Sequence, residues 1–484
     1  MKYRSIWTDF TNNEKYSKLN KDIKVDVLII GGGITGISTL YHLLDSNLNV
    51  CLVERNKIVG GVSSKTTGKL TYLQDNIYTK LTSKYSFLVA KAYLESQKYA
   101  ISLVENIINQ NDIECDFVKQ KSYLFANNEK EVNKIKKEKE ILERMNVNII
   151  ENNDSNYLIG VDDTAYFHPV KYLMELAKIC TSKGKLIYEN TKIVNIKKEE
   201  NNYICYTDNN KIIAKKVVLA CHYPFFLFPF LFPLKGYLER SYLSASKTKD
   251  NKNISGINVI NPIESFRYYS DNYNNYFIFL NGTHKLSVKY DIRKNFNYLL
   301  DKLKDKNLVP EYIWSNTDII TNDYLPYIGY INENLLLATG YNTWGMTNGS
   351  LAGYILSELI LYGKSKYMNL FNPKRSMPVS NIGGILNDIV CSAKPFIENK
   401  IYKNKIFLKD KVLFTKIDGK QVGVYIDSNN NEHIVYNKCP HLKCSLIFNE
   451  IEKTWDCPCH SSRFSIDGKC IQGPSCYDIS FKKN

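Results

Sequence analysis

The chain has 484 residues, of which 44% are hydrophobic, so it is long enough for two or three domains with ordinary apolar cores. Its formal net charge is +15, but lysines spread along the chain carry it and no nucleic-acid recognition motif accompanies them, which excludes a nucleic-acid partner from our expectations. We expect a cytoplasmic protein, because the N-terminus has no apolar targeting segment and the apolar run at 224–234 is short and broken by prolines. Contact of this run with a membrane surface is left open but not expected.

The first predicted elements form a nucleotide-binding unit. Residues 25–30 are typical of a buried parallel strand, a glycine-rich turn and a helix follow, and a second strand ends at Glu54. Gly31, Gly33 and Gly36 have the spacing that permits a tight turn, the approach of a pyrophosphate to the backbone, and close packing of helix on strand. A carboxylate at Glu54 can accept hydrogen bonds from a ribose diol. The sequence therefore predicts a dinucleotide site at the start of an α/β sheet.

Further elements follow along the chain. Helices are predicted at 84–110, 129–145, 170 to about 184, and 350–361, and strands within 186–206, at 215–221 and at 334–340. Residues 226–320 alternate in pattern and are rich in Tyr and Phe, which predicts a mostly β substrate domain. A stretch with Pro, Gly and Ser at 376–397 is expected to be a linker, and the short strands beyond it indicate a small all-β domain.

Two ligand boxes lie in this last part. Cys439 and His441 form Cys-x-His, and Cys457 and His460 follow as Cys-x-x-His. This is the pattern of a Rieske [2Fe–2S] centre, in which two thiolates bind one iron and two imidazoles bind the other. A zinc ribbon is the alternative, because cysteine and histidine at such spacings also bind zinc. The surrounding residues, WDCPCHSSRFSIDGKCIQGPS, favour the Rieske centre.

The two boxes and the proline loop after them resemble the disulfide-bearing Rieske class of cytochrome bc complexes. The resemblance implies a disulfide between Cys444 and Cys459, and a hydrogen bond from Ser462 to a bridging sulfide of the cluster. Lys443 and Ser461 depart from it, because they replace the usual glycines.

The first 375 residues resemble the D-amino-acid-oxidase-like family of FAD-dependent oxidoreductases, which includes glycine oxidase and DadA-like proteins. The matching motifs are GGVSS after Glu54, VVLACH, DYLPYIG and LLLATGYNTWGMTNGS. The resemblance implies an α/β FAD-binding (glutathione-reductase-like Rossmann) domain with a mostly β substrate domain, followed by a small all-β Rieske domain. The FAD-binding parts are expected at about 22–85, 155–225 and 325–375, the substrate part at about 86–154 and 226–324, and the Rieske [2Fe–2S] domain at 398–484.

The resemblance also implies site residues. FAD contacts are expected from Gly60, Gly61, Ser63, Ser64, Gly340, Gly345, Met346 and Thr347. A helix expected to begin near Asn348 would direct its N-terminus at the flavin and stabilise the negative charge of the reduced ring. Arg267 is the candidate clamp for a substrate carboxylate, since a guanidinium binds carboxylates bidentately. His222 and His284 are candidate pocket residues, and Cys221-His222 replaces the family's usual Thr-Gly.

These observations predict an FAD-dependent oxidoreductase acting on a CH–NH or CH–NH2 group. It would oxidise a small amine or amino-acid-like substrate and pass electrons through the cluster to an unidentified one-electron acceptor, a protein or a quinone. A non-enzymatic redox carrier or sensor, and a reductase with reversed electron flow, remain as alternatives. A Rieske oxygenase is disfavoured, because the histidines outside the ligand boxes do not supply the two-histidine, one-carboxylate iron site that it needs.

Overall fold

The computed structural model describes residues 1–9, 15–152, 158–225, 235–271, 273–286, 291–376 and 412–482. The predicted linker and the apolar run at 224–234 lie almost entirely outside these ranges. In the part of the chain that the structure describes, no helix is long and apolar enough to cross a membrane.

Buried aliphatic runs form the parallel sheet that the sequence predicted. Strand β1 (Ile23–Ile30) pairs in parallel with β2 (Val50–Val53) on one side and β10 (Lys211–Leu219) on the other. The parallel order continues through β7 (Leu186–Tyr188) and β17 (Leu335–Thr339). Within the described ranges this sheet has eight strands, completed by the antiparallel β8 (Asn195–Glu199), β9 (Asn202–Tyr206) and β16 (Tyr327–Asn332).

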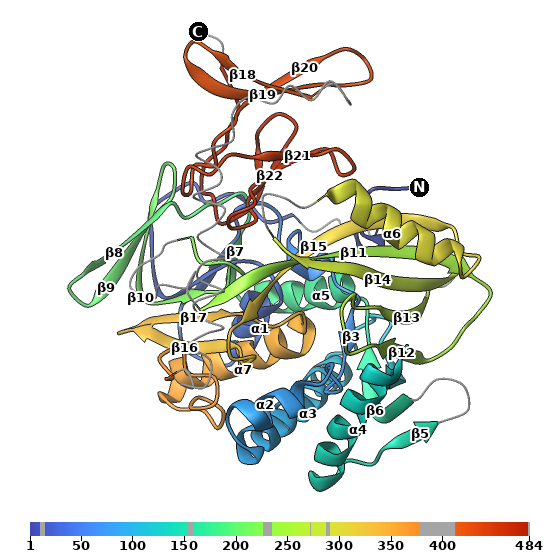
Figure 1. Ribbon diagram of the computed structural model, residues 1–484. Coiled ribbons are helices and arrows are strands. Elements are labelled where there is room, and N and C mark those ends of the chain that lie inside the picture. The colour runs from blue at the N-terminus through green and yellow to red at the C-terminus, as the bar shows by residue number, and fades with distance from the viewer. Residues whose placement is uncertain are drawn as a thin grey trace.

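Helices cover this sheet and extend away from it (Figure 1). Helix α1 (Ile34–His42) packs against α7 (Gly345–Tyr362) and α5 (Pro169–Ser182), while α2 (Ile77–Lys84) contacts α3 (Phe87–Gln110) and α4 (Glu129–Arg144). The predicted start of the last helix was wrong, because α7 begins at Gly345 and not near Asn348 or Ser350. Gly345, Thr347 and Asn348 in its first turn have low helix propensity, but Thr347 and Asn348 are fully buried and α7 packs against α1, so tertiary packing overrides propensity there.

The second sheet is mostly antiparallel and contains the strands that the alternating pattern at 226–320 predicted, together with strands from residues 69–166. Its long strands are β11 (Gly236–Thr248), β14 (Asn275–Lys285) and β15 (Pro310–Thr321). The other strands are β3 (Lys69–Leu70), β4 (Val118–Phe125), β5 (Ile150–Asn152), β6 (Leu158–Tyr166), β12 (Ile254–Ile257) and β13 (Ser265–Ser270). Helix α6 (Ile292–Lys304), which the sequence pattern did not predict, packs its apolar face on β11 and β14.

The C-terminal part consists of two small antiparallel sheets. One contains β18 (Val412–Ile417), β19 (Lys420–Ile426) and β20 (Glu432–Tyr436), and the other contains β21 (Ile447–Asn449), β22 (Thr454–Asp456), β23 (Arg463–Ser465) and β24 (Cys470–Gln472). The buried Trp455 joins them, since a Cβ at Gly423 on β19 would lie 2.6 Å from its ring. The sheet with β21 and β22 lies between the other small sheet and the rest of the chain (Figure 1). The predicted fold class is therefore confirmed.

Candidate functional site

The turn between β1 and α1 has the close packing that a dinucleotide site needs. Gly31 has a φ of +117°, and a Cβ at Gly36 would lie 1.9 Å from the Gly31 carbonyl oxygen, so both positions require glycine. Helix α1 begins at Ile34, and the backbone N–H of Ile34 donates to Ser63 Oγ at 3.0 Å. The N-terminal turn of α1 thus faces the predicted phosphate position, where free N–H groups and the helix dipole favour an anion.

Glu54 follows the last residue of β2. Its carboxylate accepts hydrogen bonds from the backbone N–H groups of Gly32 and Asn56, both at 2.9 Å. Burial raises the pKa of Glu54, and these two hydrogen bonds oppose the shift by stabilising the charged form. The acidic group predicted to bind a ribose therefore lies directly beside the glycine turn.

A cavity of about 220 Å³ begins at this turn. The predicted residues that line it are Gly31, Gly33, Glu54, Gly60, Gly61, Ser63, His222, Gly340, Gly345 and Met346. The other three do not line it: Gly36 packs against Gly31, Ser64 donates to the Gly61 carbonyl, and Thr347 is buried in the first turn of α7. The glycine cradle, the buried acid and the helix N-terminus fit the pyrophosphate and ribose of FAD.

A second cavity of about 470 Å³ adjoins the first at the N-terminus of α7. Gly345 and Met346 line both cavities. The second cavity has buried charges that sequence reasoning missed. Lys69 donates from Nζ to Ser265 Oγ at 2.5 Å, and burial, reinforced by the charge of Arg267, lowers its pKa to about 7.

Carboxylates lie on the wall between the two cavities. Glu239 lines the larger cavity and Asp318 the smaller one, and the two residues are cross-strand partners on β11 and β15. Burial, with the charge of Glu239, raises the pKa of Asp318 to about 7. Nothing in the local sequence marked these residues, since only the strand register brings them together.

The three candidate catalytic residues lie in different places. His222 lines the first cavity, and burial lowers its pKa to about 4. It has a φ of 65°, a conformation that suits the glycine expected there from the resemblance. Arg267 is fully buried under the rings of Trp7, Tyr166 and Tyr269, and His284 is hydrogen-bonded with Tyr242; neither lines either cavity. The substrate roles of Arg267 and His284 stay predictions.

The predicted cluster ligands come from two loops with the same backbone pattern. In the first, Cys439 N–H donates to the Cys444 carbonyl, and in the second, Cys457 N–H donates to the Ser462 carbonyl, at 2.8 and 2.7 Å. Lys443 and Ser461, the residues in place of the usual glycines, have φ values of 61° and 62°. Both loops therefore keep the left-handed turn without glycine.

The four side chains form a site that fits a [2Fe–2S] cluster. The rings of His441 and His460 lie 5.0 Å apart, and burial lowers their pKa values to about 4 and about 3, which keeps the imidazoles neutral as metal ligands must be. His441 Nδ1 is buried and has no hydrogen-bond partner among the residues that the structure describes. The hydrogen bond between the thiols of Cys439 and Cys457 lowers the pKa of Cys439 to about 7, and Ser462 contributes to the shift. Their role as cluster ligands remains a prediction.

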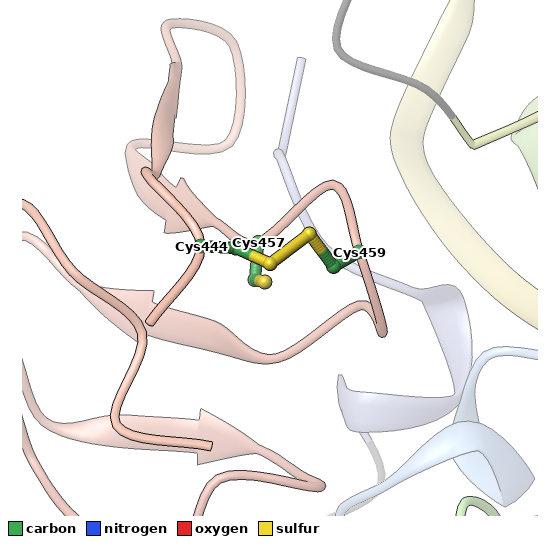
Figure 2. A group of neighbouring side chains, drawn as sticks. All are labelled: Cys444, Cys457 and Cys459. Carbon is green, nitrogen blue, oxygen red and sulfur yellow. A yellow bond between two sulfur atoms is a disulfide. The ribbon is translucent and has the colours of Figure 1, made fainter. Parts of the chain in front are cut away.

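The predicted disulfide is confirmed. Cys444 and Cys459 are bonded, with their Cα atoms 6.6 Å apart, and tie the two ligand loops together. Figure 2 shows the Cys457 sulfur beside this bond. The three sulfur atoms lie within 4.8 Å of one another, but two of them are joined, so this group is not itself a three-thiolate metal site.

The C-terminal domain packs against both larger sheets. Arg240 Nη1 on β11 lies 2.6 Å from Asp456 Oδ2 on β22, and both side chains are fully buried. The predicted ligand His460 packs its ring 5.3 Å from that of Tyr223, which lines the first cavity. Gly473 and Pro474, in the predicted proline loop, line the same cavity. The cluster site therefore adjoins the nucleotide cavity.

Known proteins share both parts of this architecture. The family described as FAD dependent oxidoreductase matches residues 26–359, and that described as Rieske [2Fe-2S] domain matches residues 399–480. A Bacillus subtilis protein named as the Rieske 2Fe-2S iron-sulfur protein YhfW is 30% identical over 97% of this chain and 96% of its own length. Gamma-glutamylputrescine oxidoreductase of Escherichia coli is 22% identical over 71% of this chain and 85% of its own. The structure of glycine oxidase from Geobacillus kaustophilus superposes with a TM-score of 0.60 at 16% identity, over 73% of this chain and 99% of that one.

Proposed function

The chain belongs to the family of FAD-dependent oxidoreductases and carries a C-terminal Rieske [2Fe–2S] domain, and from this membership we propose that it oxidises a small amine or amino-acid-like substrate and passes the electrons through the cluster to a one-electron acceptor. When bound, FAD would accept a hydride from the substrate and the cluster would carry electrons singly. The two groups together would convert two-electron oxidation into one-electron transfer.

The contact between the cluster site and the nucleotide cavity carries this proposal. Tyr223 contacts His460 on one side and lines the cavity on the other, and Pro474 lines the cavity directly. Arg240 and Asp456 form a buried ion pair across the same interface. Electrons would therefore need no domain movement to pass between the two groups.

The N-terminus of α7 supports hydride acceptance at the flavin. Gly345 and Met346 line both cavities at the first turn of this 18-residue helix. None of the described side chains caps this helix, so its backbone N–H groups and the positive end of its dipole are available to stabilise negative charge on a reduced flavin. The larger cavity beside this turn is the proposed substrate site.

The charges of that cavity support a small substrate with a cationic and an anionic group. Glu239 can pair with an ammonium group, and Lys69 can pair with a carboxylate. Because the pKa of Lys69 is about 7, the approach of a carboxylate would favour its protonated form. A zwitterionic amino acid or a γ-glutamylated amine has this chemistry.

Two measurements on the protein carrying both groups test the proposal. In an anaerobic spectroelectrochemical titration the cluster should be reduced at a higher potential than the flavin, since histidine-ligated clusters lie at roughly −150 to +300 mV. Anaerobic addition of glycine or γ-glutamylputrescine should bleach the flavin first and the cluster afterwards. A flavin potential above that of the cluster would contradict the direction of flow and indicate a reductase. A flavin that no amine or amino acid bleaches would contradict the substrate class and favour a redox carrier.

A further inference from the structure

The proline loop of the C-terminal domain is bonded to the chain segment that follows Glu54. Arg55 Nη2 donates to the Ser475 carbonyl at 2.6 Å, and Asn56 Nδ2 donates to the Ile471 carbonyl at 3.3 Å. Arg55 Nη1 also donates to Cys470 Sγ at 3.3 Å. Residues 470–476 are thus held against the carboxyl end of β2.

The end of the first cavity beside Glu54 corresponds to the adenosine end of a dinucleotide site. The acidic residue at the end of the second strand binds the adenosine ribose in such folds, and here that residue is Glu54. The cavity wall near it is drawn from both domains: Arg55, Asn56, Lys192 and Ile193 come from the FAD-binding part, and Ile471, Gln472, Gly473 and Pro474 come from the proline loop. A nucleotide placed on Glu54 therefore lies between the two domains.

The apolar side chain of Ile471 indicates what the loop contributes. It is 39% exposed, although isoleucine is among the residues most often buried. It lines the cavity together with the apolar side chains of Ile193 and Pro474. A flat heterocyclic base in this end of the cavity would remove apolar surface of Ile471 from water, which is favourable.

We propose that the proline loop, residues 470–476, forms one wall of the FAD site at its adenosine half, with Ile471 packing on the base. FAD binding and docking of the Rieske domain then stabilise each other, because a ligand that contacts the docked domain binds the undocked state less tightly. The docked domain serves as part of the cofactor site as well as an electron carrier. This inference goes beyond the proposed function, since it holds for either direction of electron flow.

The first test measures FAD affinity in full-length protein that retains its cluster, after FAD is removed and added back, by quenching of flavin fluorescence. Ile471→Ser should raise the dissociation constant about tenfold, which equals about 1.4 kcal/mol. Ile471→Leu should restore most of the affinity. Leu413→Ser is the matched control, because Leu413 is 37% exposed in the same domain but does not line the cavity. It should leave the affinity unchanged.

The second test is reciprocal and follows hydrogen exchange of the backbone amides in residues 470–476. Exchange in this loop should slow when FAD is added to the apoprotein, and the amides of β18 should not change. An Ile471→Ser protein that binds FAD as tightly as the wild type, with loop exchange unaffected by FAD, would overturn the proposal. If the protein shows both effects but transfers no electrons from flavin to cluster, the two effects support this inference. Only the proposed function is then contradicted.

Discussion

The buried pair between Arg240 and Asp456 offers the sharpest test of how firmly the Rieske domain is docked. Arg240 Nη1 lies 2.6 Å from Asp456 Oδ2, and both side chains are 0% exposed. Asp456 also accepts hydrogen bonds from Arg463 at 3.0 Å and Thr454 at 2.8 Å. Burial alone would raise the pKa of Asp456, but the charges of Arg463 and Arg240 outweigh it and hold the pKa at about 2. The aspartate is therefore ionised at neutral pH.

Arg240→Ala removes one partner and leaves Asp456 buried with a weakened set of partners. Breaking a buried ion pair in this way destabilises proteins by about 3–5 kcal/mol. We expect about 3 kcal/mol, the lower end, because Arg463 still contacts the carboxylate. Arg293→Ala is the matched control, since Arg293 also pairs across the interface, with Glu450, but is 46% exposed. An exposed pair of this kind contributes about 0–1 kcal/mol.

The assay is equilibrium unfolding in urea, followed separately through the visible absorbance of the cluster and the fluorescence of FAD. In Arg240→Ala the cluster domain should lose stability by the larger amount, and the rate of electron exchange between flavin and cluster should fall. Arg293→Ala should show neither effect. Equal losses in the two variants, or a loss below about 1 kcal/mol for Arg240→Ala, would refute the assignment of this pair as the anchor of the interface.

Three further predictions concern single sites. Gly33→Val should abolish FAD binding, because a branched side chain blocks the approach of the pyrophosphate to the backbone; unchanged FAD content after purification would contradict the placement. His441→Ala should lose the [2Fe–2S] spectrum and about two irons per chain while FAD stays bound, and bound zinc in place of iron would contradict the ligand set. Asp318→Asn should raise the melting temperature at about pH 8 but not at about pH 4. The pKa of Asp318 is raised to about 7, so the folded protein keeps a proton on this carboxyl that the unfolded chain releases at lower pH. Ionisation of Asp318 therefore destabilises the wild-type protein as pH rises. An equal effect at both pH values would show that charge is not the cause.

The parts of the site that the sequence predicted are those built from neighbouring residues. The glycine turn and the acid after the second strand lie within one strand–helix–strand unit, and each ligand box spans only a few residues. In such motifs the spacing along the chain fixes the spacing in space. The replacement of glycine by Lys443 and Ser461 did not disturb the ligand loops, because each of these residues adopts the positive φ itself.

The parts that could not be predicted depend on strand register and domain packing. Arg240 and Asp456 are 216 residues apart, and neither has a local signal for its partner. The chemistry of Arg267 suits it to bind a substrate carboxylate, but the sequence could not show whether it reaches a cavity. Alternation along a strand shows that a side chain faces one side of the sheet, but not what lies on that side. It lies among aromatic rings, whereas Lys69, from a two-residue strand, lines the cavity.

The surroundings of the two predicted histidine ligands differ, and this difference would give electron transfer through the cluster a direction. His460 is 6% exposed and contacts Tyr223 at the nucleotide cavity, whereas His441 is partly exposed and lies near the exposed Lys443. If both rings ligate the same iron, as the Rieske pattern requires, one ligand faces the flavin side and the other faces the surface. Electrons entering past Tyr223 would leave past His441. A lysine at that exit favours an acceptor with a negatively charged surface, since complementary charge speeds the encounter of electron-transfer partners.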